Sequence, residues 1–400
     1  MTESAAPTRR EMQRAETDKQ IHDAALRLLA TSGTDGLSLP AIAQASGFST
    51  GPIYSRFGGA DDVIVVLWDL YLRDELVRVI TLQLSWVNGS GPITDDLREL
   101  YEAPGDVVNA LIEVMATLRR YSFAREVVQP QIQEILADAA MRYPEMPDSI
   151  FKMQIGYLLG SIFARPIFAP VLLDHLFEGL EITRRLADSR HAWDARTRSK
   201  ASVPFTIPEI DGEANVRREF IRGALETIAV TGVEGASAQR IARAAGYGFS
   251  TAYSYFKSKH ELADEALKIV IGQVFSLNHQ SYVLVDHQEF VRRIIAVQRG
   301  ALSEQGRLLR QLRVESVVAA RHSTVLSRHA QVAFTDVIEN AKRLGEVRGD
   351  GEFSRLATWT IIATHAFAVP LLSGCSHYGN DIDWTPVAEQ LFFVRDNFKA

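Results

Sequence analysis

Cysteine and long apolar runs are scarce in this sequence. Cys375 is the one cysteine among 400 residues, so no disulfide can form within the chain, which suits a reducing cytosol. Residues 1–14 are polar and charged, without the apolar stretch of a secretory signal peptide. The most apolar segment, 155–173, is interrupted by an arginine and two prolines, whereas a membrane-spanning helix needs about 20 mainly apolar residues. We therefore expect a cytoplasmic protein with no membrane partner, in which this segment is a buried core helix.

The residue patterns of common catalytic and metal sites are also absent. The ten histidines form no pattern with metal-ligand spacing, and there is no glycine-rich phosphate loop. Ser254 and Lys257 form an S-x-x-K pair, but the companion motifs of a serine nucleophile are missing. Asp381 and Asp383 lack the rest of a calcium loop. We therefore expect no enzyme activity, no metal ion and no cofactor.

Charge and length remain compatible with a binding or regulatory protein. The formal net charge of −6 excludes a uniformly basic nucleic-acid coat but not a local basic face. A chain of 400 residues is long enough for about two to four domains. Apolar residues recur at helical spacing, as in Ala24, Ala25, Leu28 and Leu29, and alternating strand-like runs are scarce. This periodicity predicts an all-α fold.

An internal repeat divides the chain into two halves. Glycines, apolar residues and aromatics of the first half recur 199 positions later without a gap (232 − 33, for example). The matched pairs include Gly33 and Gly232, Ile42 and Ile241, Gly47 and Gly246, and Tyr54 and Tyr253. Towards the ends of the halves, 168–170 matches 368–370, and helices are expected over 175–187 and 384–398. Because composition bias would not place these residues at a fixed offset, the pattern indicates tandem duplication of a domain pair.

Each copy carries the signals of two short helices joined by a glycine turn. In the first copy, Ser38 is placed to cap a helix over 39–45, Gly47 permits the turn, and Ser49 is placed to cap a helix over 50–57. The second copy predicts helices over 238–245 and 249–256, joined by Gly246. This order is that of the helix-turn-helix, whose second helix lies in the major groove of DNA.

The repeated segments resemble the first domain of the TetR family of bacterial regulators, whose pattern reads A-x-x-L-F-x-x-x-G, T-x-x-x-I-A and A-G-V-S-x-G-x-L-Y-x-x-F-x-x-K-x-x-L. The second copy matches at Ala224, Gly232, Ser237, Ile241, Ala242, Ala245, Gly246, Tyr253, Phe256, Lys259 and Leu262. The first copy matches at Ala25, Gly33, Ser38, Ile42, Ala43, Gly47, Ser49, Gly51, Tyr54 and Phe57. The first copy then departs from the pattern, since Ala60 stands where the family has its lysine.

The resemblance implies a division of labour within each half. In the TetR family, the small N-terminal domain binds operator DNA, and the larger helical domain holds a small ligand and supplies dimer contacts, usually through its last two helices. It implies a ligand-responsive transcriptional repressor built from two TetR-like units. The expected segments are an N-terminal arm with the first DNA-binding domain (1–60), a first helical domain (61–187), a linker (188–214), a second DNA-binding domain (215–260) and a second helical domain (261–400).

The period of the repeat is close to the length of one chain in the homodimers of this family. One chain could therefore form an intramolecular pseudo-dimer, or two chains could form a homodimer. A homodimer reads a palindrome because of its symmetry, whereas two different heads suit an asymmetric site in double-stranded DNA. The alternative function is a ligand-sensing or scaffold protein with degenerate heads. The missing lysine of the first copy favours this alternative, and the good match of the second copy argues against it.

The polar and aromatic residues of the two motifs are the predicted DNA contacts. They are Ser38, Ser49, Thr50, Gly51, Pro52, Tyr54 and Arg56 in the first copy, and Ser237, Arg240, Phe249, Ser250, Thr251, Tyr253, Tyr255, Lys257 and Lys259 in the second. Phe57 and Phe256 are expected in the core. The second copy is richer in cations, so we expect it to contribute more salt-dependent affinity. In the first copy, an arm with Arg9, Arg10 and Arg14 could supply charge to the DNA backbone or minor groove.

Candidate effector residues lie in the helical domains. A small apolar or anionic effector would contact Phe123, Met153, Tyr157 and Arg165 in the first domain, and Trp359, His365 and Phe367 in the second. Ordinary helical core is the competing interpretation for each aromatic residue. Arg165 stands among apolar residues and needs a partner, for which we favour an internal acid over an anionic ligand.

Overall fold

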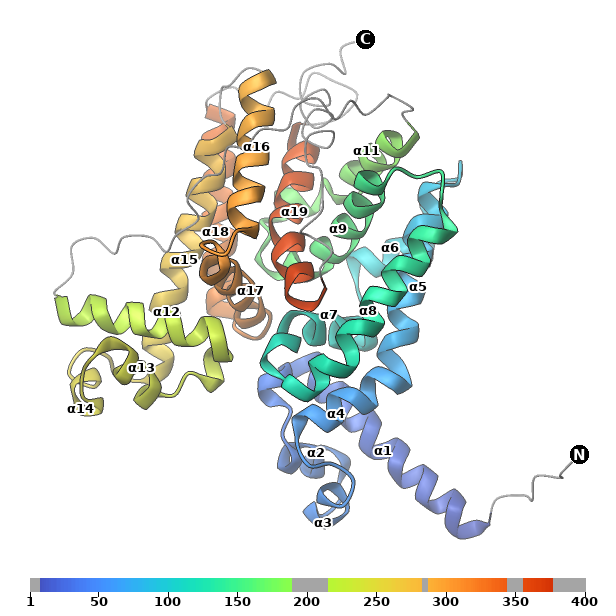
Figure 1. Cartoon of the computed structure of the whole chain (residues 1–400), viewed down its shortest axis with the longest axis vertical. Coiled ribbons are helices and arrows are strands. Elements are labelled where there is room, and N and C mark those ends of the chain that lie inside the picture. Colours follow the sequence, from blue (N-terminus) through green and yellow to red (C-terminus); the bar gives the residue numbers. More distant parts are fainter. Residues whose placement is uncertain (1–7, 189–214, 283–286, 344–354, 377–400) are drawn as a thin grey trace, which may run out of the picture.

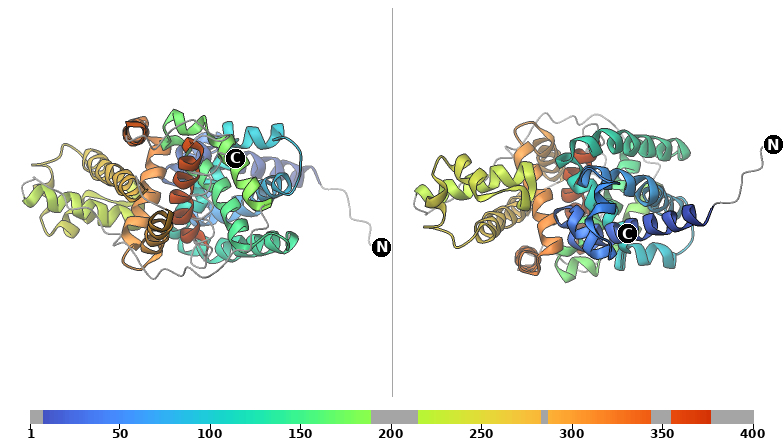
Figure 2. Two further views of the ribbon diagram at one scale, coloured as in Figure 1. Left: turned by 90° about the horizontal axis from the view of Figure 1, so that it is seen from above. Right: turned by 90° about the horizontal axis from the view of Figure 1, so that it is seen from below.

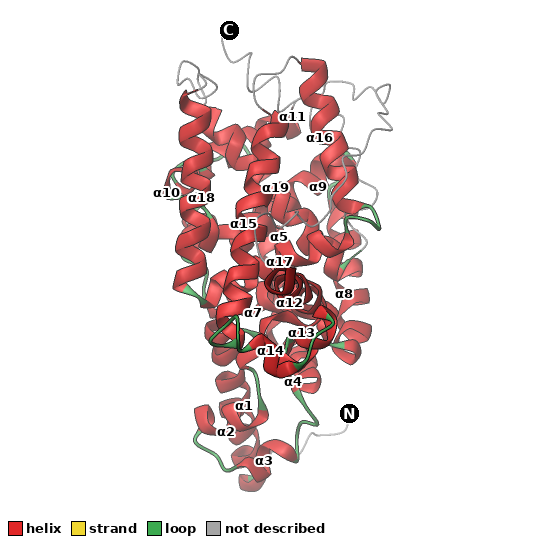
Figure 3. Ribbon diagram, turned by 90° about the vertical axis from the view of Figure 1, so that its left-hand side faces the viewer, coloured by secondary structure: helices red, strands yellow, loops and turns green. Residues whose placement is uncertain are grey.

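The computed structural model describes residues 8–188, 215–282, 287–343 and 355–376, which are helices and their connections (Figure 1). We call residues 8–188 the first unit and residues 215–376 the second unit. The linker expected over 188–214 and the helix expected over 384–398 lie outside the described residues, apart from Asp188, which ends a helix. Among the helices described, none combines the length and apolarity that crossing a membrane requires. The prediction of an all-α fold is confirmed for the described part of the chain (Figure 3).

The first unit begins with a three-helix head and continues into a helical domain. Its helices are α1 (Arg9–Ser32), α2 (Leu39–Ser46), α3 (Thr50–Tyr54), α4 (Ala60–Leu67), α5 (Arg73–Val87), α6 (Asp95–Glu102), α7 (Asp106–Thr117), α8 (Ser122–Arg142), α9 (Asp148–Ala164), α10 (Pro170–Leu173) and α11 (Leu176–Asp188). Short turns of other helix types lie between them: η1 (Thr34–Gly36), η3 (Leu118–Arg120), η4 (Arg165–Ile167) and the π-helical η2 (Trp68–Leu72).

The second unit repeats this order with fewer breaks. Its helices are α12 (Asn215–Gly235), α13 (Ala238–Ala245), α14 (Phe249–Ala252), α15 (Lys259–Tyr282), α16 (His287–Leu302), α17 (Arg307–His322), α18 (Thr324–Arg343) and α19 (Arg355–Cys375). In the view of Figure 1, the two heads lie on the lower side of the molecule, α1–α3 at the bottom and α12–α14 at the left. Seen from below, the second head projects at the left edge of the molecule and the first head lies nearer the middle, with orange helices of the second unit between them (Figure 2).

Helices α9 and α19 form the centre of the molecule, where the two units meet (Figure 1). Both helices are buried along most of their length, so their hydrophobic surface is covered by the opposite unit as well as by their own. Gly160 permits the close approach, because a Cβ there would collide with the carbonyl oxygen of Thr364. The units are therefore joined through the backbones of α9 and α19 as well as through side chains.

The apolar segment 155–173 is not one helix, which corrects the expectation for it. Helix α9 ends at Ala164, a 3-10 turn covers Arg165–Ile167, and α10 begins at Pro170. Pro166 and Pro170 have no backbone N–H and cannot continue the ladder of α9. In the second unit, α19 continues past Pro370, so the matched prolines have different consequences. The helix expected over 175–187 is confirmed as α11.

Candidate nucleic-acid interface

The first head (α1–α3) is built by local signals in its sequence. The Ser38 hydroxyl accepts a hydrogen bond from the Ala41 N–H at 3.3 Å and caps α2, as predicted. Gly47 follows α2 with φ 75°, a left-handed conformation that a side chain would strain. Ser49 precedes α3, although its side chain makes no capping hydrogen bond. These residues fix the angle at which α3 leaves α2.

Helix α3 is shorter than the sequence suggested. It ends at Tyr54 instead of continuing to Phe57, because the chain turns there to bury the Phe57 ring, which is 3% exposed. In the second head (α12–α14), α14 ends at Ala252 instead of Phe256 for the same reason, since Phe256 is 4% exposed. Burial of the two phenylalanines is confirmed. The predicted helix lengths were wrong because core packing decides where each helix ends.

The candidate DNA contacts of the first head form a small, weakly charged surface. Ser49, Thr50, Gly51 and Tyr54 are exposed, and the Tyr54 ring is 59% exposed. Pro52 is half-buried. These residues lie on α3 or just before it, where a recognition helix presents its N-terminal part to base edges.

Arg56 is engaged within the first head. Its Nε donates to the Asp18 carboxylate at 2.5 Å, and its Nη1 donates to the Pro52 carbonyl oxygen at 2.7 Å. The guanidinium thus fastens the end of α3 to α1, and its charge is compensated by a carboxylate. A phosphate would have to compete with Asp18 for this side chain.

The second head presents four exposed aromatic rings around α14. Phe249 and Tyr253 are 49% and 52% exposed, and their rings lie edge to face with centroids 5.2 Å apart. Tyr255 is 39% exposed, and Ser250 is exposed beside half-buried Thr251. Tyr247, in the turn before α14, is 37% exposed and was not among the predicted contacts. Its position directly after Gly246 was the signal that could have identified it.

Cations of the second head differ in their freedom to meet a phosphate. Arg240 is exposed and donates to the Gly235 carbonyl oxygen at 3.0 Å, and its backbone N–H donates to the capping Ser237 hydroxyl at 3.3 Å. Lys257 is exposed, and its side chain forms no ion pair within the described residues. Lys259, the position of the family's lysine, binds the Glu234 carboxylate at 2.9 Å and is half-buried. Arg240 and Lys257 are therefore the better placed of these cations.

The expected N-terminal arm is helical in the described residues. Thr8 and Glu11 form a reciprocal capping box, with the Thr8 N–H donating to the Glu11 carboxylate at 2.7 Å. Arg9, Arg10 and Arg14 are exposed on the first turns of α1. The charges of the predicted arm are thus carried on the first turns of α1, and their contact with DNA stays a prediction.

Most candidate effector residues meet at the junction between the units. Met153, Tyr157, His365 and Phe367 are buried on α9 and α19, and the Tyr157 and His365 rings lie 6.4 Å apart. Trp359 is partly buried, whereas Phe123 is 48% exposed on α8 and lies outside the core. The sequence suggested one group of effector residues in each helical domain. In the structure, the buried residues of the two groups pack against one another, as Tyr157 and His365 do.

His365 links the two central helices. Its Nε2 lies 3.1 Å from the Met153 carbonyl oxygen and its Nδ1 lies 2.8 Å from the Ile361 carbonyl oxygen. Burial lowers the pKa of His365, although these two carbonyls oppose that shift. The Tyr157 hydroxyl donates to the Leu176 carbonyl oxygen at 2.6 Å. Both rings are thereby held in place as structural parts of the junction.

Arg165 has a backbone partner. Its Nη1 donates to the Tyr101 carbonyl oxygen, and within the described residues it forms no ion pair. Burial lowers the pKa of Arg165, and the charge of Glu102 partly offsets this effect. Among the described residues, the favoured internal salt bridge is not formed, and the half-buried side chain reaches a carbonyl oxygen instead.

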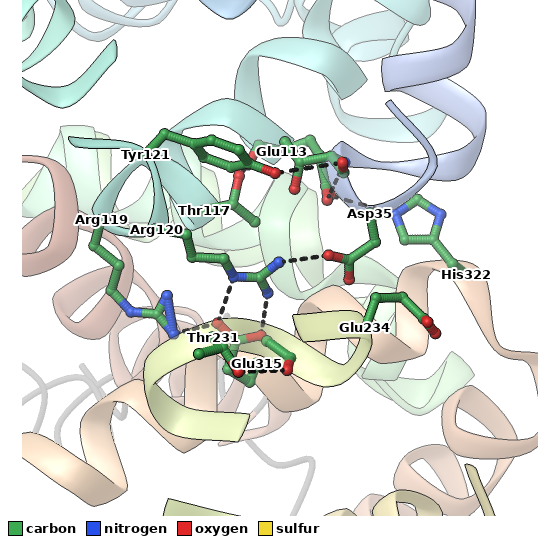
Figure 4. Close-up of polar contacts among 12 residues, drawn as sticks. Asp35, Glu113, Thr117, Arg119, Arg120, Tyr121, Thr231, Glu234, Glu315 and His322 are labelled. Carbon is green, nitrogen blue, oxygen red and sulfur yellow. Dashed lines mark hydrogen bonds and ion pairs between the residues drawn. The ribbon is translucent and has the colours of Figure 1, made fainter. Parts of the chain in front are cut away.

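A second set of charged residues joins each head to the opposite unit (Figure 4). We call it the interunit cluster, and its members are Asp35, Glu113, Arg119, Arg120, Glu315, Arg321 and His322. The fully buried Glu315 of α17 accepts hydrogen bonds from Arg119 and Arg120 of η3. Arg120 also donates to Asp35 at 3.0 Å. Although burial opposes its charge, Glu315 and Asp35 hold the pKa of Arg120 above its ordinary value.

The cluster contains the same arrangement with the units exchanged. Glu113 of α7 is 1% exposed and lies 3.6 Å from the Arg321 Nε and 3.4 Å from the His322 Nε2. It also accepts the Thr34 N–H at 3.2 Å. Burial alone would raise the pKa of Glu113, but His322, Arg321 and Arg120 hold it below its ordinary value. A buried carboxylate in each unit thus lies against two basic side chains of the other.

The cluster reaches the end of the first helix of each head. Arg119 Nη2 donates to the Ala229 carbonyl oxygen of α12 at 2.9 Å, and His322 Nδ1 lies 3.2 Å from the Thr31 carbonyl oxygen of α1. Sequence reasoning missed these residues. Glu113, Arg119 and Arg120 recur as Glu315, Arg321 and His322, always 202 positions later (315 − 113, 321 − 119, 322 − 120). That second offset was the available signal.

Comparison with known families agrees with the geometry of the two heads. A family model described as bacterial regulatory proteins, tetR family, matches residues 21–65 and again residues 220–266. Each match begins on the first helix of a head and extends beyond its helix-turn-helix. No curated protein matches the chain significantly. Within the described part of the chain, no group of three or more His, Cys, Asp or Glu side chains could hold a metal ion.

Proposed function

The chain is a bacterial regulator of the tetR family with two DNA-binding units, and we propose that it is a ligand-responsive cytoplasmic repressor. In this proposal, one chain acts as an intramolecular pseudo-dimer whose unlike heads read the two halves of an asymmetric operator. The single observation that carries it is the reciprocal cluster, in which Glu113 and Glu315 each lie against basic side chains of the other unit.

The differences between the heads support an asymmetric operator. Two identical heads related by a two-fold axis would read the same half-site twice. Here the residues that match across the repeat differ, with Thr50 and Gly51 on α3 against Phe249 and Ser250 on α14. Aromatic and threonine methyl contacts favour thymine, and hydroxyl groups bind phosphates or base edges. We therefore expect half-sites of different sequence.

The link between heads and helical domains supports a ligand response. Near the end of its first helix, each head presents a backbone carbonyl to a side chain of the opposite helical domain, Ala229 to Arg119 and Thr31 to His322. A ligand that bound more tightly to one arrangement of the heads than to another would shift the population towards the arrangement it prefers. This shift would change the affinity for the operator. Ligand binding and DNA binding would then affect each other reciprocally.

The test is binding of the full chain to the promoter DNA beside its own coding sequence. Affinity would be measured at two salt concentrations, with the mass of the complex determined by light scattering and the site mapped by footprinting. We expect salt-sensitive binding of one chain to a non-palindromic site. Two chains on a palindrome would replace the pseudo-dimer with a homodimer while keeping the regulator.

The competing function is a ligand-sensing or scaffold protein whose heads no longer bind DNA. The compensation of Arg56 by Asp18 in the first head favours it. Selection from a random DNA library would decide the matter, because it does not depend on where the operator lies. Failure to enrich any sequence would support the scaffold and contradict the repressor.

A further inference from the structure

A cavity of about 290 Å³ lies between the two units, close to the interunit cluster. The first unit contributes Arg119 and Arg125, with Gln129, from η3 and α8. The second unit contributes Arg307 and Arg310, with Gln311, from α17. Pro370, Ser373 and Gly374 of α19 complete the wall. None of the described residues that line it carries a carboxylate.

The positive charge of this cavity is only partly compensated by its surroundings. Arg307 pairs with the exposed Glu304 at 2.9 Å. Arg125 is exposed and forms no ion pair within the described residues. Arg310 donates to the carbonyl oxygens of Ala301 and Ser303, the latter at 3.2 Å, and to no carboxylate among the residues described. The walls therefore favour an anion.

Arg119 offers unused donors beside the cavity. Its Nη2 binds Glu315 and the Ala229 carbonyl oxygen, but its buried Nε and Nη1 have no hydrogen-bond partner among the described residues. Buried donors that lack a partner cost free energy, and a guanidinium is suited to bidentate binding of carboxylate or phosphate. An anion in the cavity would attract this guanidinium, and a small movement of the side chain would bring its unpartnered donors to the anion.

We propose that the cavity between the units binds a small organic anion with at least two negative charges, carried by carboxylate or phosphate groups. Its volume corresponds to roughly ten water-sized groups, given about 30 Å³ for each water. Four guanidinium groups would bind the charges, and the amides of Gln129 and Gln311 would bind neutral oxygens or hydroxyls. The site requires both units, so neither helical domain forms it alone.

Binding at this site would be coupled to the second head through Arg119. Arg119, which lines the cavity, also binds the Ala229 carbonyl oxygen near the end of α12. An anion that attracts the Arg119 guanidinium towards the cavity would change how strongly Nη2 holds α12. This regulatory consequence rests on the proposed repressor function, whereas the anion site itself does not.

The site is tested by isothermal titration calorimetry on the full chain without DNA. The probes are citrate, succinate and glycerol 3-phosphate, and neutral succinamide is the control for shape. We expect at least one of the three anions to bind at millimolar concentration or below, and succinamide not to bind. Absence of binding by all three anions, or equal binding of succinamide, would overturn the proposal.

Substitutions assign the binding to the cavity. Arg125→Gln changes an exposed side chain, so it leaves the fold intact, and Arg310→Gln provides a second test at a half-buried position. Each should weaken binding about tenfold, as expected for the loss of one charge-assisted hydrogen bond. Arg142→Gln removes the same charge from the far end of α8 and should leave affinity unchanged. Equal affinity in Arg125→Gln, Arg310→Gln and the native chain would overturn the assignment.

Measuring operator affinity with and without the anion distinguishes binding at the cavity from a regulatory effect of that binding. If the anion that binds in calorimetry also changes DNA affinity, and Arg119→Lys reduces that coupling, the link through Arg119 is supported. If the anion binds and DNA affinity stays the same, the site stands and the coupling is refuted. A chain that binds no DNA at all would refute the repressor function, while the calorimetric result would still decide the anion site.

Discussion

In the first head, Ser38 caps α2 at 3.3 Å and Gly47 turns the chain with φ 75°. In the second head, Ser237 caps α13 at 3.3 Å and Gly246 makes the same turn with φ 77°. The backbones of the two motifs are therefore specified by the same local signals. Both heads also bury a phenylalanine shortly after the recognition helix ends.

The surfaces on these matching backbones are different. The first head exposes one large aromatic ring beside α3, that of Tyr54, and its Arg56 is paired with Asp18. The second head exposes Phe249, Tyr253 and Tyr255 and keeps Arg240 and Lys257 without a carboxylate partner among the described residues. The same capping and turn residues thus maintain the helix-turn-helix backbone in both heads, while the side chains exposed around α3 and α14 differ.

The largest effects should come from the two buried glutamates of the interunit cluster. Glu315→Gln would leave Arg119 without a carboxylate among the described residues and Arg120 with Asp35 alone, and the two side chains are 11% and 5% exposed. We expect it to lower the free energy of unfolding by about 3–5 kcal/mol. Glu113→Gln should cost less, about 1–3 kcal/mol, because its partners Arg321 and His322 lie at the longer distances of 3.6 Å and 3.4 Å.

Chemical denaturation monitored by circular dichroism would measure both variants. Glu102→Gln is the control, since it removes the same charge from an exposed pair with Arg98 at 3.4 Å and should cost less than about 1 kcal/mol. Equal losses in Glu315→Gln and Glu113→Gln would show that the two halves of the cluster are energetically equivalent. That outcome would contradict the ranking drawn from the distances.

Neutralising the cations of each head should affect DNA binding unequally. Replacing Arg240, Arg243 and Lys257 with Gln should flatten the slope of log affinity against log salt by about 0.9 for each phosphate that the head no longer neutralises. Replacing Lys19, Arg27 and Arg56 removes the same charge from the first head and should change the slope less, because Arg56 is held by Asp18. Fluorescence anisotropy with the operator across a salt series measures both slopes. Equal changes would mean that the heads contribute alike.

The turn glycines should behave alike in the two heads. Gly47→Ala and Gly246→Ala should each destabilise by about 1–2 kcal/mol, the cost of a left-handed conformation for a residue with a Cβ. A Cβ meets no atom within 4 Å at either position, so the backbone alone sets the cost. Gly51→Ala is the control, because Gly51 lies in α3 without positive φ and also has open space around it. Thermal unfolding of the three variants tests this, and a large difference between the first two would break the backbone equivalence.

The motif could be predicted from the sequence because its causes are local. Ser38 and Gly47 act on their own neighbours, so the cap and the turn are readable without knowledge of the rest of the chain. The end of α3 was mispredicted because it depends on burial of Phe57, a tertiary effect. The helical start of α1 was missed although Thr8 and Glu11 form a capping box visible in the sequence.

The interunit cluster was harder to predict because its contacts cross between distant segments. Glu315 lies 195 residues from Arg120, so helical periodicity says nothing about their contact. The cluster residues of the two units also repeat at an offset of 202, as Glu113 and Glu315 do, whereas the heads repeat at 199. An alignment without gaps that matches the heads therefore does not match the cluster residues. The partner of Arg165 could not be predicted from the sequence either, because it is a backbone carbonyl oxygen, which every residue type carries.

The smallest effect should distinguish the heads by pH. His22 of the first head is half-buried against the Phe57 ring, at a centroid distance of 6.1 Å, whereas the matching residue of the second head is the fully buried Ile221. Burial lowers the pKa of His22, with Arg56 acting in the same direction and Asp18 and Asp23 opposing. The unfolded state therefore binds more protons as the pH falls below about 6.5, and the stability of the first head decreases.

Hydrogen exchange of the α1 and α12 amides, compared between about pH 7.5 and about pH 5.5 after correction for the intrinsic exchange rate, measures this difference. Acid should reduce the protection of α1 more than that of α12. His22→Ile copies the second head and should remove the excess loss from α1. If α1 in this variant still loses protection on acidification, other groups of the first head cause its pH dependence and the contrast between His22 and Ile221 does not explain it.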